Sequence, residues 1–161
     1  MAAVPGWIAS YIAAGGSPSL EAIQPAGIDL SLDKVYEFLE AGVLSRGGRK
    51  LPGTRELREE EGRWVLKPGA YKIRFSERVF IPQSFLGLCL PRSSLLRMGA
   101  LLSCALWDPG YHGRGEALLT VHNPHGLVIE KGARVAQLVL IRIKPTPYEL
   151  YRGFYHGENL T

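Results

Sequence analysis

The residues with the greatest chemical potential lie in short segments where polar side chains end or interrupt apolar runs. The segment PRSSLLR, residues 91–97, places Arg92, Ser93, Ser94 and Arg97 directly after a proline that ends a strand-like run. If Ser93 and Ser94 open a helical turn, their N–H groups and hydroxyls can hold phosphate oxygens while arginine supplies positive charge. The alternative interpretation is a serine N-cap on a short surface helix.

A second segment, WDPGYHGRGE at residues 107–116, sets Asp108 at the end of an apolar run. A rigid Pro-Gly turn then brings in the aromatic ring of Tyr111. An aspartate at the end of a strand can be held as a general base for water, and the ring can form a flat wall beside it. A plain Asp-Pro-Gly turn is the alternative.

Three further segments carry weaker signals. Asp29 lies between apolar neighbours in AGIDL, where it can also be a capping or turn residue. Gln137 interrupts the apolar run of GARVAQL, and a buried amide needs a partner from the backbone or a ligand. The aromatic and glycine residues of YRGFYHGEN, residues 151–159, fit either a flexible tail that folds over a base and phosphates or a frayed terminus.

Short strands and tight turns are predicted to position these segments. Apolar residues at helical spacing predict one short helix over Pro5–Gly15. Period-two patterns and short apolar runs predict strands at Ala26–Leu32, Lys34–Leu39, Trp64–Leu66, Ala70–Phe75, Phe85–Leu90, Leu101–Trp107, Ala117–Val121 and Arg134–Ile143. Turns are predicted at Pro68-Gly69, Pro82, Pro109-Gly110, residues 123–126 and Lys131-Gly132, and a loop or mobile hairpin at Leu44–Gly62. The pattern indicates a mainly β sandwich, jelly roll or barrel.

Composition narrows the functional classes. The 161 residues are 46% hydrophobic and 21% charged, which fits one domain over residues 1–161 with a substantial core. The net charge of +4 is spread along the chain instead of forming one basic stripe, so nucleic acid is not the expected partner. No run is long and apolar enough for a membrane span, and the start lacks a signal-peptide pattern, so we expect a cytoplasmic protein. Cys89 and Cys104 are interpreted as buried free thiols.

The order of the five segments is more specific than any one of them. AGIDL, PRSSLLRMG, WDPGYHGRGE, GARVAQLVL and a Gly/aromatic tail resemble the five ordered motifs of dUTPases and dCTP deaminases, in a form closest to archaeal dUTPases. The resemblance implies a jelly-roll-like dUTPase β-clip fold with a short N-terminal helix. It also implies a homotrimer with shared active sites, in which residues 150–161 form a flexible closing tail.

The resemblance further implies hydrolysis of dUTP to dUMP and pyrophosphate with Mg²⁺ held by phosphates and water, with no direct metal ligand from the chain. Asp108 matches the water-activating aspartate, and Tyr111 the ring beneath the deoxyribose. The phosphate-binding positions match Arg92, Ser93, Ser94, Arg97 and Gln137. Asp29 matches a structural or metal-water-linked aspartate. Arg152, Phe154 and Tyr155 occupy the place of the closing tail, although the usual dUTPase glycine-serine-threonine ending is absent.

The alternative activity is that of a dCTP deaminase or a bifunctional dCTP deaminase/dUTPase. The glutamate of those deaminases falls on a pattern resembling L-E-[FIL]-x-N, and the matching position here is Thr120, counted back from Asn123. A threonine hydroxyl cannot transfer a proton in the same way near neutral pH. Glu116 lies four residues earlier, and an alternative alignment would bring it toward the site. A non-catalytic nucleotide sensor and a zinc-dependent deaminase are disfavoured, because Asp108 is present and the zinc motif is not.

Overall fold

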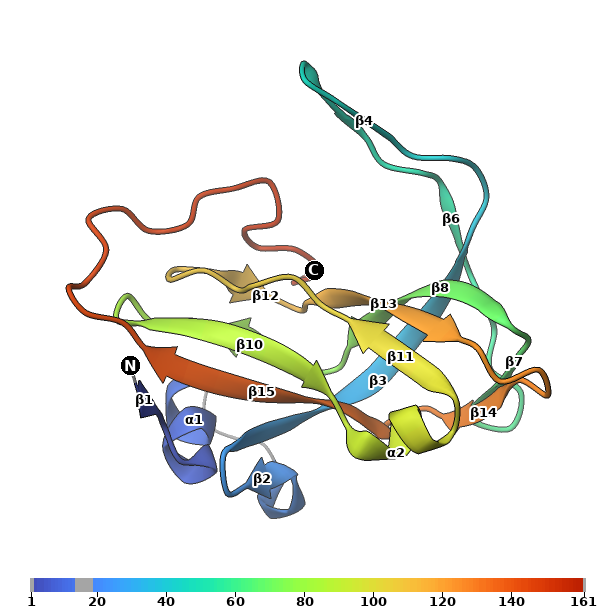
Figure 1. Cartoon of the computed structure of the whole chain (residues 1–161), viewed down its shortest axis with the longest axis horizontal. Helices are drawn as coiled ribbons and strands as arrows, with labels where there is room; N and C mark the ends of the chain where they lie inside the picture. Colours follow the sequence, from blue (N-terminus) through green and yellow to red (C-terminus); the bar gives the residue numbers. More distant parts are fainter. Residues whose placement is uncertain (1, 14–18, 161) are drawn as a thin grey trace.

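The computed structural model describes residues 2–13 and 19–160, and its architecture is mainly β (Figure 1). The helices are α1 (Gly6–Ala13), a 3-10 turn (Leu20–Ala22) and α2 (Ser93–Arg97). The strands, in chain order, are β1 (Ala2–Ala3), β2 (Ile23–Gln24), β3 (Gly27–Phe38), β4 (Val43–Ser45), β5 (Gly48–Lys50), β6 (Thr54–Glu56), β7 (Arg63–Leu66), β8 (Gly69–Phe75), β9 (Val79–Phe80), β10 (Phe85–Pro91), β11 (Ala100–Ser103), β12 (His112–Gly113), β13 (Glu116–Val121), β14 (Leu127–Glu130) and β15 (Arg134–Arg142).

Strand β3 connects the two halves of the main sheet. Its first half pairs antiparallel with β15, and its second half pairs antiparallel with β8. Register shifts at Leu32/Lys34 and at Arg134/Ala136 mark the point where the pairing changes. Because such irregularities bend a strand and increase its twist, the sheet curls instead of staying flat. Beyond β8 the order continues through β13 to β11, while β10 pairs with the other edge of β15.

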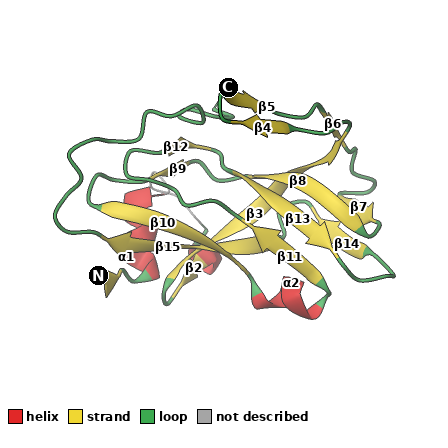
Figure 2. Cartoon of the chain, turned by 45° about the horizontal axis from the view of Figure 1, so that its top comes forward, coloured by secondary structure: helices red, strands yellow, loops and turns green. Residues whose placement is uncertain are grey.

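The core lies inside this curled sheet because apolar side chains alternate along its strands. Ile28 and Leu30 of β3, Ile73 and Phe75 of β8, and Leu138 of β15 are all fully buried. Burying side chains of this size contributes roughly 1.5–3 kcal/mol each. Figure 2 shows α1 beside β15 and α2 at the end of β10, so helices cover only the ends of the sheet.

The structure confirms the mainly β prediction and most of the predicted elements, with several corrections. The N-terminal helix is present, although Gly15 of the predicted span lies outside the described residues. The predicted strands Ala26–Leu32 and Lys34–Leu39 form the single strand β3, because the bulge lets the chain continue. The predicted strand Leu101–Trp107 ends at Ser103, and only Trp107 pairs again, with Gly87. Strand β14 was not predicted, since four residues between two turns carry little periodicity.

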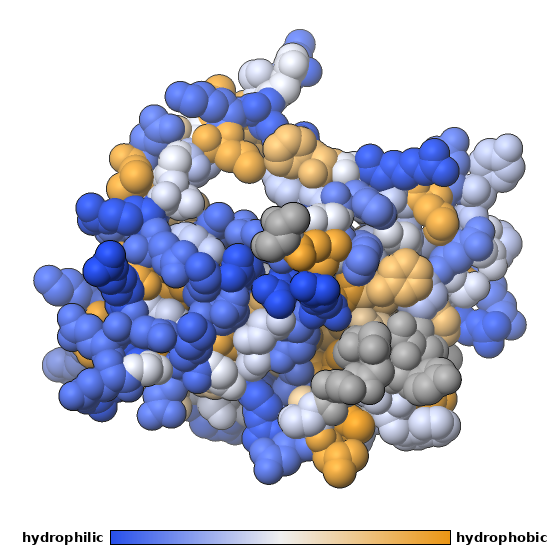
Figure 3. All heavy atoms as spheres, turned by 180° about the vertical axis from the view of Figure 1, so that it is seen from behind, coloured by the Kyte–Doolittle hydropathy of each residue, from blue (hydrophilic) through white to orange (hydrophobic). Residues whose placement is uncertain are grey.

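The predicted hairpin within Leu44–Gly62 projects from the body as a narrow arm, residues 39–53, built on β4 and β5 (Figure 1). Val43 and Leu44 are exposed by 55% and 88%, so the outer part of the arm adds nothing to the core. The base of the arm is held where Leu39 N donates to Gly53 O at 2.9 Å. Seen from behind, an opening passes between the arm and the body, with hydrophobic atoms along its upper edge (Figure 3).

Candidate functional site

The turn at residues 108–111 holds an aspartate and an aromatic ring in a fixed relation. Tyr111 N donates to Asp108 O at 3.0 Å, and Gly110 has a φ of +91°, a conformation that side chains rarely adopt. A Cβ at Gly110 would also lie 2.9 Å from the Cβ of Leu150, where the C-terminal tail passes. The turn therefore requires glycine for two independent reasons. It leaves Asp108 exposed and turns Tyr111 inward.

Asp108 and Tyr111 both line a cavity of about 390 Å³. The segment 103–108 and strand β13 form its inner side. Phe38, Leu51 and Pro52 at the base of the arm form a second side, and the tail closes a third through Tyr151, Tyr155 and Glu158. The walls are mostly apolar, and a cavity of this size matches a small organic ligand.

The Tyr111 ring is only 3% exposed and is fixed from two directions. It stacks on Trp107 with the ring centroids 5.4 Å apart and an interplanar angle of 2°. Its hydroxyl donates to Oε1 of Glu158 at 2.7 Å. Burial and the bond to Glu158 raise the pKa of Tyr111, so the hydroxyl remains a donor at neutral pH. The ring is thus a preformed flat surface that the tail of the same chain covers.

The charged groups of the cavity are mostly acidic. Lys72 Nζ lies 3.1 Å from Glu116 Oε1, and Asn159 donates to the same oxygen at 3.4 Å. Burial raises the pKa of Glu158, and the hydrogen bond from Tyr111 opposes that shift. The cavity is therefore lined by three carboxyl groups and one ammonium group, which belong to Asp108, Glu116, Glu158 and Lys72. This lining suits an uncharged part of a ligand better than a polyphosphate.

Arginine residues gather instead around Asp29, at the junction of β3, β10 and β15. Asp29 is 2% exposed, and its Oδ2 lies 3.0 Å from Nη1 of Arg92 and 3.7 Å from Nη1 of Arg134. Gln137 is directly opposite Asp29 in the β15–β3 ladder and opposite Leu90 in the β10–β15 ladder. The register thus brings together three residues predicted from the sequence: Asp29, Arg92 and Gln137.

The pKa of the Asp29 carboxyl is subject to two opposing effects. Burial raises the pKa of its carboxyl, and the nearby guanidiniums of Arg92 and Arg134 oppose that shift. The approach of Arg92 does not have the geometry of a hydrogen bond, so Oδ2 is buried without a hydrogen-bond donor. A buried acceptor without a donor is unusual, because such groups are normally satisfied by protein or water.

The serine pair lies beside this group, at the start of α2. Ser93 and Ser94 are the first residues of the helix, and Arg92 occupies the N-cap position. The helical turn predicted for the serines is therefore present, whereas the alternative of a serine N-cap is wrong. Both serines and Arg97 are exposed, and Arg97 Nη1 donates to Ser93 O at 3.3 Å.

The two groups of predicted residues are separated within one chain. Gly87 and Trp107 exchange backbone hydrogen bonds of 2.9 and 3.0 Å, which fixes Asp108 beside the start of β10. Arg92 follows Gly87 by five residues and lies just past the end of β10, at the N-cap of α2. At about 3.3 Å per residue, the backbone of Arg92 lies roughly 16 Å along the chain from the bridge that precedes Asp108.

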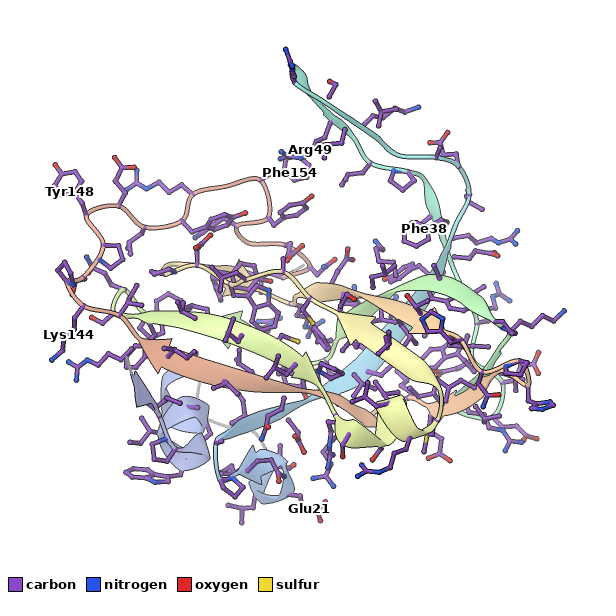
Figure 4. The ribbon with its side chains drawn as sticks, viewed as in Figure 1. Glu21, Phe38, Arg49, Lys144, Tyr148 and Phe154 are labelled. Atoms are coloured by element: carbon purple, nitrogen blue, oxygen red, sulfur yellow. The ribbon has the colours of Figure 1, made fainter. Side chains whose placement is uncertain are left out.

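The tail of the same chain runs over the cavity. Tyr151 N donates to Pro109 O at 2.7 Å, Gly157 N to His112 O at 2.7 Å, and Arg114 N to Glu158 O at 3.0 Å. Figure 4 shows Arg49, on the arm, beside Phe154, on the tail. The guanidinium carbon of Arg49 is 4.5 Å from the Phe154 ring centroid and 5.7 Å from that of Tyr155. The three predicted tail residues are all exposed, and of these Tyr155 also lines the cavity.

Sequence reasoning missed Lys72 and Glu158. The position of Lys72 carries a faint signal, since a lysine interrupts the apolar pattern of β8. Glu158 carries none, because its role depends on where a tail without periodic structure folds. Thr120 pairs with Leu101 and Ala70 and does not line the cavity, whereas Glu116 does.

Two properties of the described chain bear on metals and membranes. Within residues 2–13 and 19–160, no three His, Cys, Asp or Glu side chains lie close enough together to hold a metal ion. No helix formed by these residues is long and apolar enough to cross a membrane.

Comparison with known proteins places the chain in a family. The family described as "dCTP deaminase-like" matches residues 7–143. The chain belongs to the dCTP deaminase-like family. A family member from Aeropyrum pernix, "Probable deoxyuridine 5'-triphosphate nucleotidohydrolase", is 51% identical over 139 residues, covering 86% of this chain and 87% of the relative. A relative with the same name from Methanosarcina mazei is 39% identical over 140 residues, covering 85% of this chain and 82% of the relative.

Two solved structures share the fold of this chain. The 2'-deoxycytidine 5'-triphosphate deaminase of Agrobacterium tumefaciens aligns with a TM-score of 0.60 and 20% identity, covering 80% of this chain and 42% of that longer chain. Native EIAV dUTPase aligns with a TM-score of 0.51 and 16% identity, covering 80% and 84%. The predicted dUTPase-like β fold is therefore confirmed.

Proposed function

We propose that the protein is a dUTP diphosphatase, which hydrolyses dUTP to dUMP and pyrophosphate. The observation that carries this proposal is that Asp108 and Tyr111 open from one rigid turn onto the same largely apolar cavity. The names of the archaeal relatives, one of them 51% identical, support the same substrate.

The cavity suits the nucleoside part of dUTP. The Tyr111 ring, stacked on Trp107, offers a flat surface to the deoxyribose once the tail moves from it. A 2′-hydroxyl pressed against that ring would lose its hydrogen bonds to water without gaining others, which costs about 1–3 kcal/mol. Backbone groups of residues 99–107 would read the uracil edge.

Asp108 would serve as the general base. A water held by its carboxylate attacks the α-phosphorus, and its proton passes to Asp108 as the new P–O bond forms. The bond from the α-phosphorus to the bridging oxygen breaks, and pyrophosphate leaves with that oxygen. A general base of this kind typically contributes about 10²–10⁴-fold to the rate.

The phosphates need a different surface, because the cavity itself is acidic. Arg92, Ser93, Ser94, Arg97 and Gln137 offer cationic and hydrogen-bonding groups. They gather at the far end of β10, whereas Asp108 lies beside its start, so roughly 16 Å of strand separates the two groups in the same chain. We therefore propose that a second copy of the chain supplies them, within the homotrimer that the family resemblance implies. Self-association completes each site.

Magnesium fits this arrangement as a partner of the substrate. The described residues provide no cluster of metal ligands, whereas a triphosphate provides oxygens. The buried Oδ2 of Asp29 has no hydrogen-bond donor, so it can accept one from a metal-bound water. Bound Mg²⁺ would neutralise phosphate charge and favour departure of pyrophosphate.

The tail would exchange its present contacts for contacts with the substrate. Arg152, Phe154 and Tyr155 lie on a segment without regular strands that already covers the cavity. Arg152 is free to face phosphates, and the two aromatic rings can close over the base. The arm holds this segment near the cavity through Arg49.

A second candidate, deamination of dCTP, has one observation in its favour: Glu116 lines the cavity. Its Oε1 is already engaged by Lys72 and Asn159, which disfavours a role in proton transfer. Product analysis separates the two activities. With Mg²⁺, dUTP should yield dUMP and pyrophosphate, and dCTP should yield no ammonia. Ammonia from dCTP, with no pyrophosphate from dUTP, would replace this proposal with the deaminase.

A further inference from the structure

Two cysteine thiols, neither of which lines the cavity, meet between β10 and the segment 103–108. The Sγ atoms of Cys89 and Cys104 lie 2.6 Å apart. Two unbonded heavy atoms prefer about 3.5–4.0 Å, and a disulfide bond measures about 2.05 Å. The two sulfurs are therefore closer to bonding distance than to ordinary contact, although both cysteines are free.

The backbone explains this approach. Gly87 and Trp107 form an antiparallel bridge with two hydrogen bonds, so the two segments that contain them run next to each other. Cys89 follows Gly87 by two residues, and Cys104 precedes Trp107 by three. The thiols therefore lie on adjacent antiparallel segments, and the irregular backbone at residues 104–106 lets Cys104 Sγ approach Cys89 Sγ to 2.6 Å.

We infer that Cys89 and Cys104 form a reversible intramolecular disulfide, made and broken by thiol–disulfide exchange with a small disulfide such as oxidised glutathione. Cys104 is half-buried and accessible, whereas Cys89 is 7% exposed. Contact with Cys104 and burial also raise the pKa of Cys89, so Cys104 is the thiol that reacts first.

The exchange has two balanced steps. Cys104 Sγ, as thiolate, attacks one sulfur of oxidised glutathione, and the displaced glutathione takes up a proton. Cys89 then loses its proton and attacks Cys104 Sγ, displacing the second glutathione. Two protein thiols are oxidised to one disulfide, and one glutathione disulfide is reduced to two thiols.

The bond would join two segments that carry different parts of the proposed site. Cys89 lies on β10, which leads to Arg92 and α2. Cys104 lies on the segment that leads through Trp107 to Asp108. Oxidation would close a loop of about 15 residues and so lower the entropy of the unfolded chain. This should raise Tm by on the order of 5–10 °C.

The test uses the full-length chain at one protein concentration. After incubation with oxidised glutathione or with a reductant, each sample is denatured, alkylated with N-ethylmaleimide and weighed by mass spectrometry. We expect the oxidised chain to take up no maleimide and to be lighter by two hydrogens, and the reduced chain to take up two. Two maleimides after oxidation, or a disulfide between chains on a non-reducing gel, would overturn the inference.

Single-cysteine variants supply the matched control. Cys89→Ala should stop at a mixed disulfide between Cys104 and glutathione, while Cys104→Ser should leave Cys89 unmodified in the folded protein. The rise in Tm on oxidation should disappear in both. Equal Tm values for oxidised and reduced wild type would also count against the bond, and this comparison needs no variant to fold.

Discussion

Tyr111 donates its hydroxyl hydrogen to Glu158 at 2.7 Å, and this bond ties the ring at the centre of the cavity to the C-terminal tail. The contact joins residues 47 positions apart in the sequence. It also places an acid with a raised pKa against a hydroxyl that stays protonated. The attachment of the tail should therefore depend on pH.

The sign of that dependence follows from Glu158. Burial raises its folded-state pKa above the ordinary value of 4.5. A group with a raised folded pKa contributes stability that is fully present below its unfolded pKa and is lost as pH rises through the folded pKa. Glu158→Gln keeps an oxygen that accepts from Tyr111 but cannot titrate. From about pH 4 to pH 8, urea unfolding should show wild type losing free energy of unfolding relative to Glu158→Gln. Parallel pH profiles would refute this.

The Tyr111 ring should set the preference for deoxyribose. Tyr111→Ala should narrow the ratio of kcat/KM for dUTP over UTP by about tenfold or more, because the surface that excludes the 2′-hydroxyl is removed. The same change should cost about 3–5 kcal/mol of stability, since the ring is buried against Trp107. Tyr111→Phe is the matched control, which retains the stack and loses the bond to Glu158 at a cost of about 1 kcal/mol. An unchanged ratio in Tyr111→Ala would remove the ring from sugar selection.

Asp108 should be needed for turnover and not for binding. Asp108→Asn keeps the size of an exposed side chain and removes its basicity, so kcat for dUTP should fall by about 10²–10⁴-fold. Affinity for a non-hydrolysable dUTP analogue, measured by calorimetry, should change little. A variant with near wild-type kcat would show that another group activates the water.

Mixing two inactive variants tests whether sites are shared between chains. Asp108→Asn and Arg92→Ala chains should each be inactive alone. In randomly mixed trimers, about a quarter of the sites should receive both intact residues from different chains and regain activity. Arg92→Ala also removes the ion pair with the buried Asp29. Ser93→Ala can therefore replace it in a second mixing experiment, because this change leaves the ion pair intact. Activity no greater than the sum of the separate variants would place both residues in one chain's site.

Glu116 should be dispensable for hydrolysis. Its carboxylate is occupied by Lys72 and Asn159, so Glu116→Gln should retain most of the kcat for dUTP, and dCTP should yield no ammonia with either protein. Ammonia production that matches dUTP turnover, and that Glu116→Gln abolishes, would establish a bifunctional enzyme.

The sequence predicted the elements with strong periodicity and the residues with unusual chemistry. Asp29 and Gln137 were predicted separately, and the antiparallel register of β3 and β15 makes them neighbours. That register could not be derived, because it depends on a bulge between Arg134 and Ala136 that has no distinct sequence pattern. Glu158 could not be predicted either, since tertiary contacts alone determine where the tail folds.

The cysteines show the same limit. Their apolar surroundings suggest buried thiols, which holds for Cys89 and only partly for Cys104. Their contact depends on the single bridge between Gly87 and Trp107. A continuous strand over Leu101–Trp107, as predicted, would have stayed paired with β13. The chain instead leaves β13 after Ser103 and meets β10 at Trp107.

Strand β3 runs from the centre of the core to the base of the arm, and this has a consequence for local stability. Its amides near Leu30 can exchange with solvent deuterium only when the core opens, whereas those near Phe38, which is 38% exposed, need only a local opening. Phe38 also lines the cavity. One strand thus supplies both a core segment whose amides should exchange slowly and a cavity wall whose amides should exchange faster. A bound nucleoside should slow exchange at Phe38 and Leu39 and leave Leu30 unchanged.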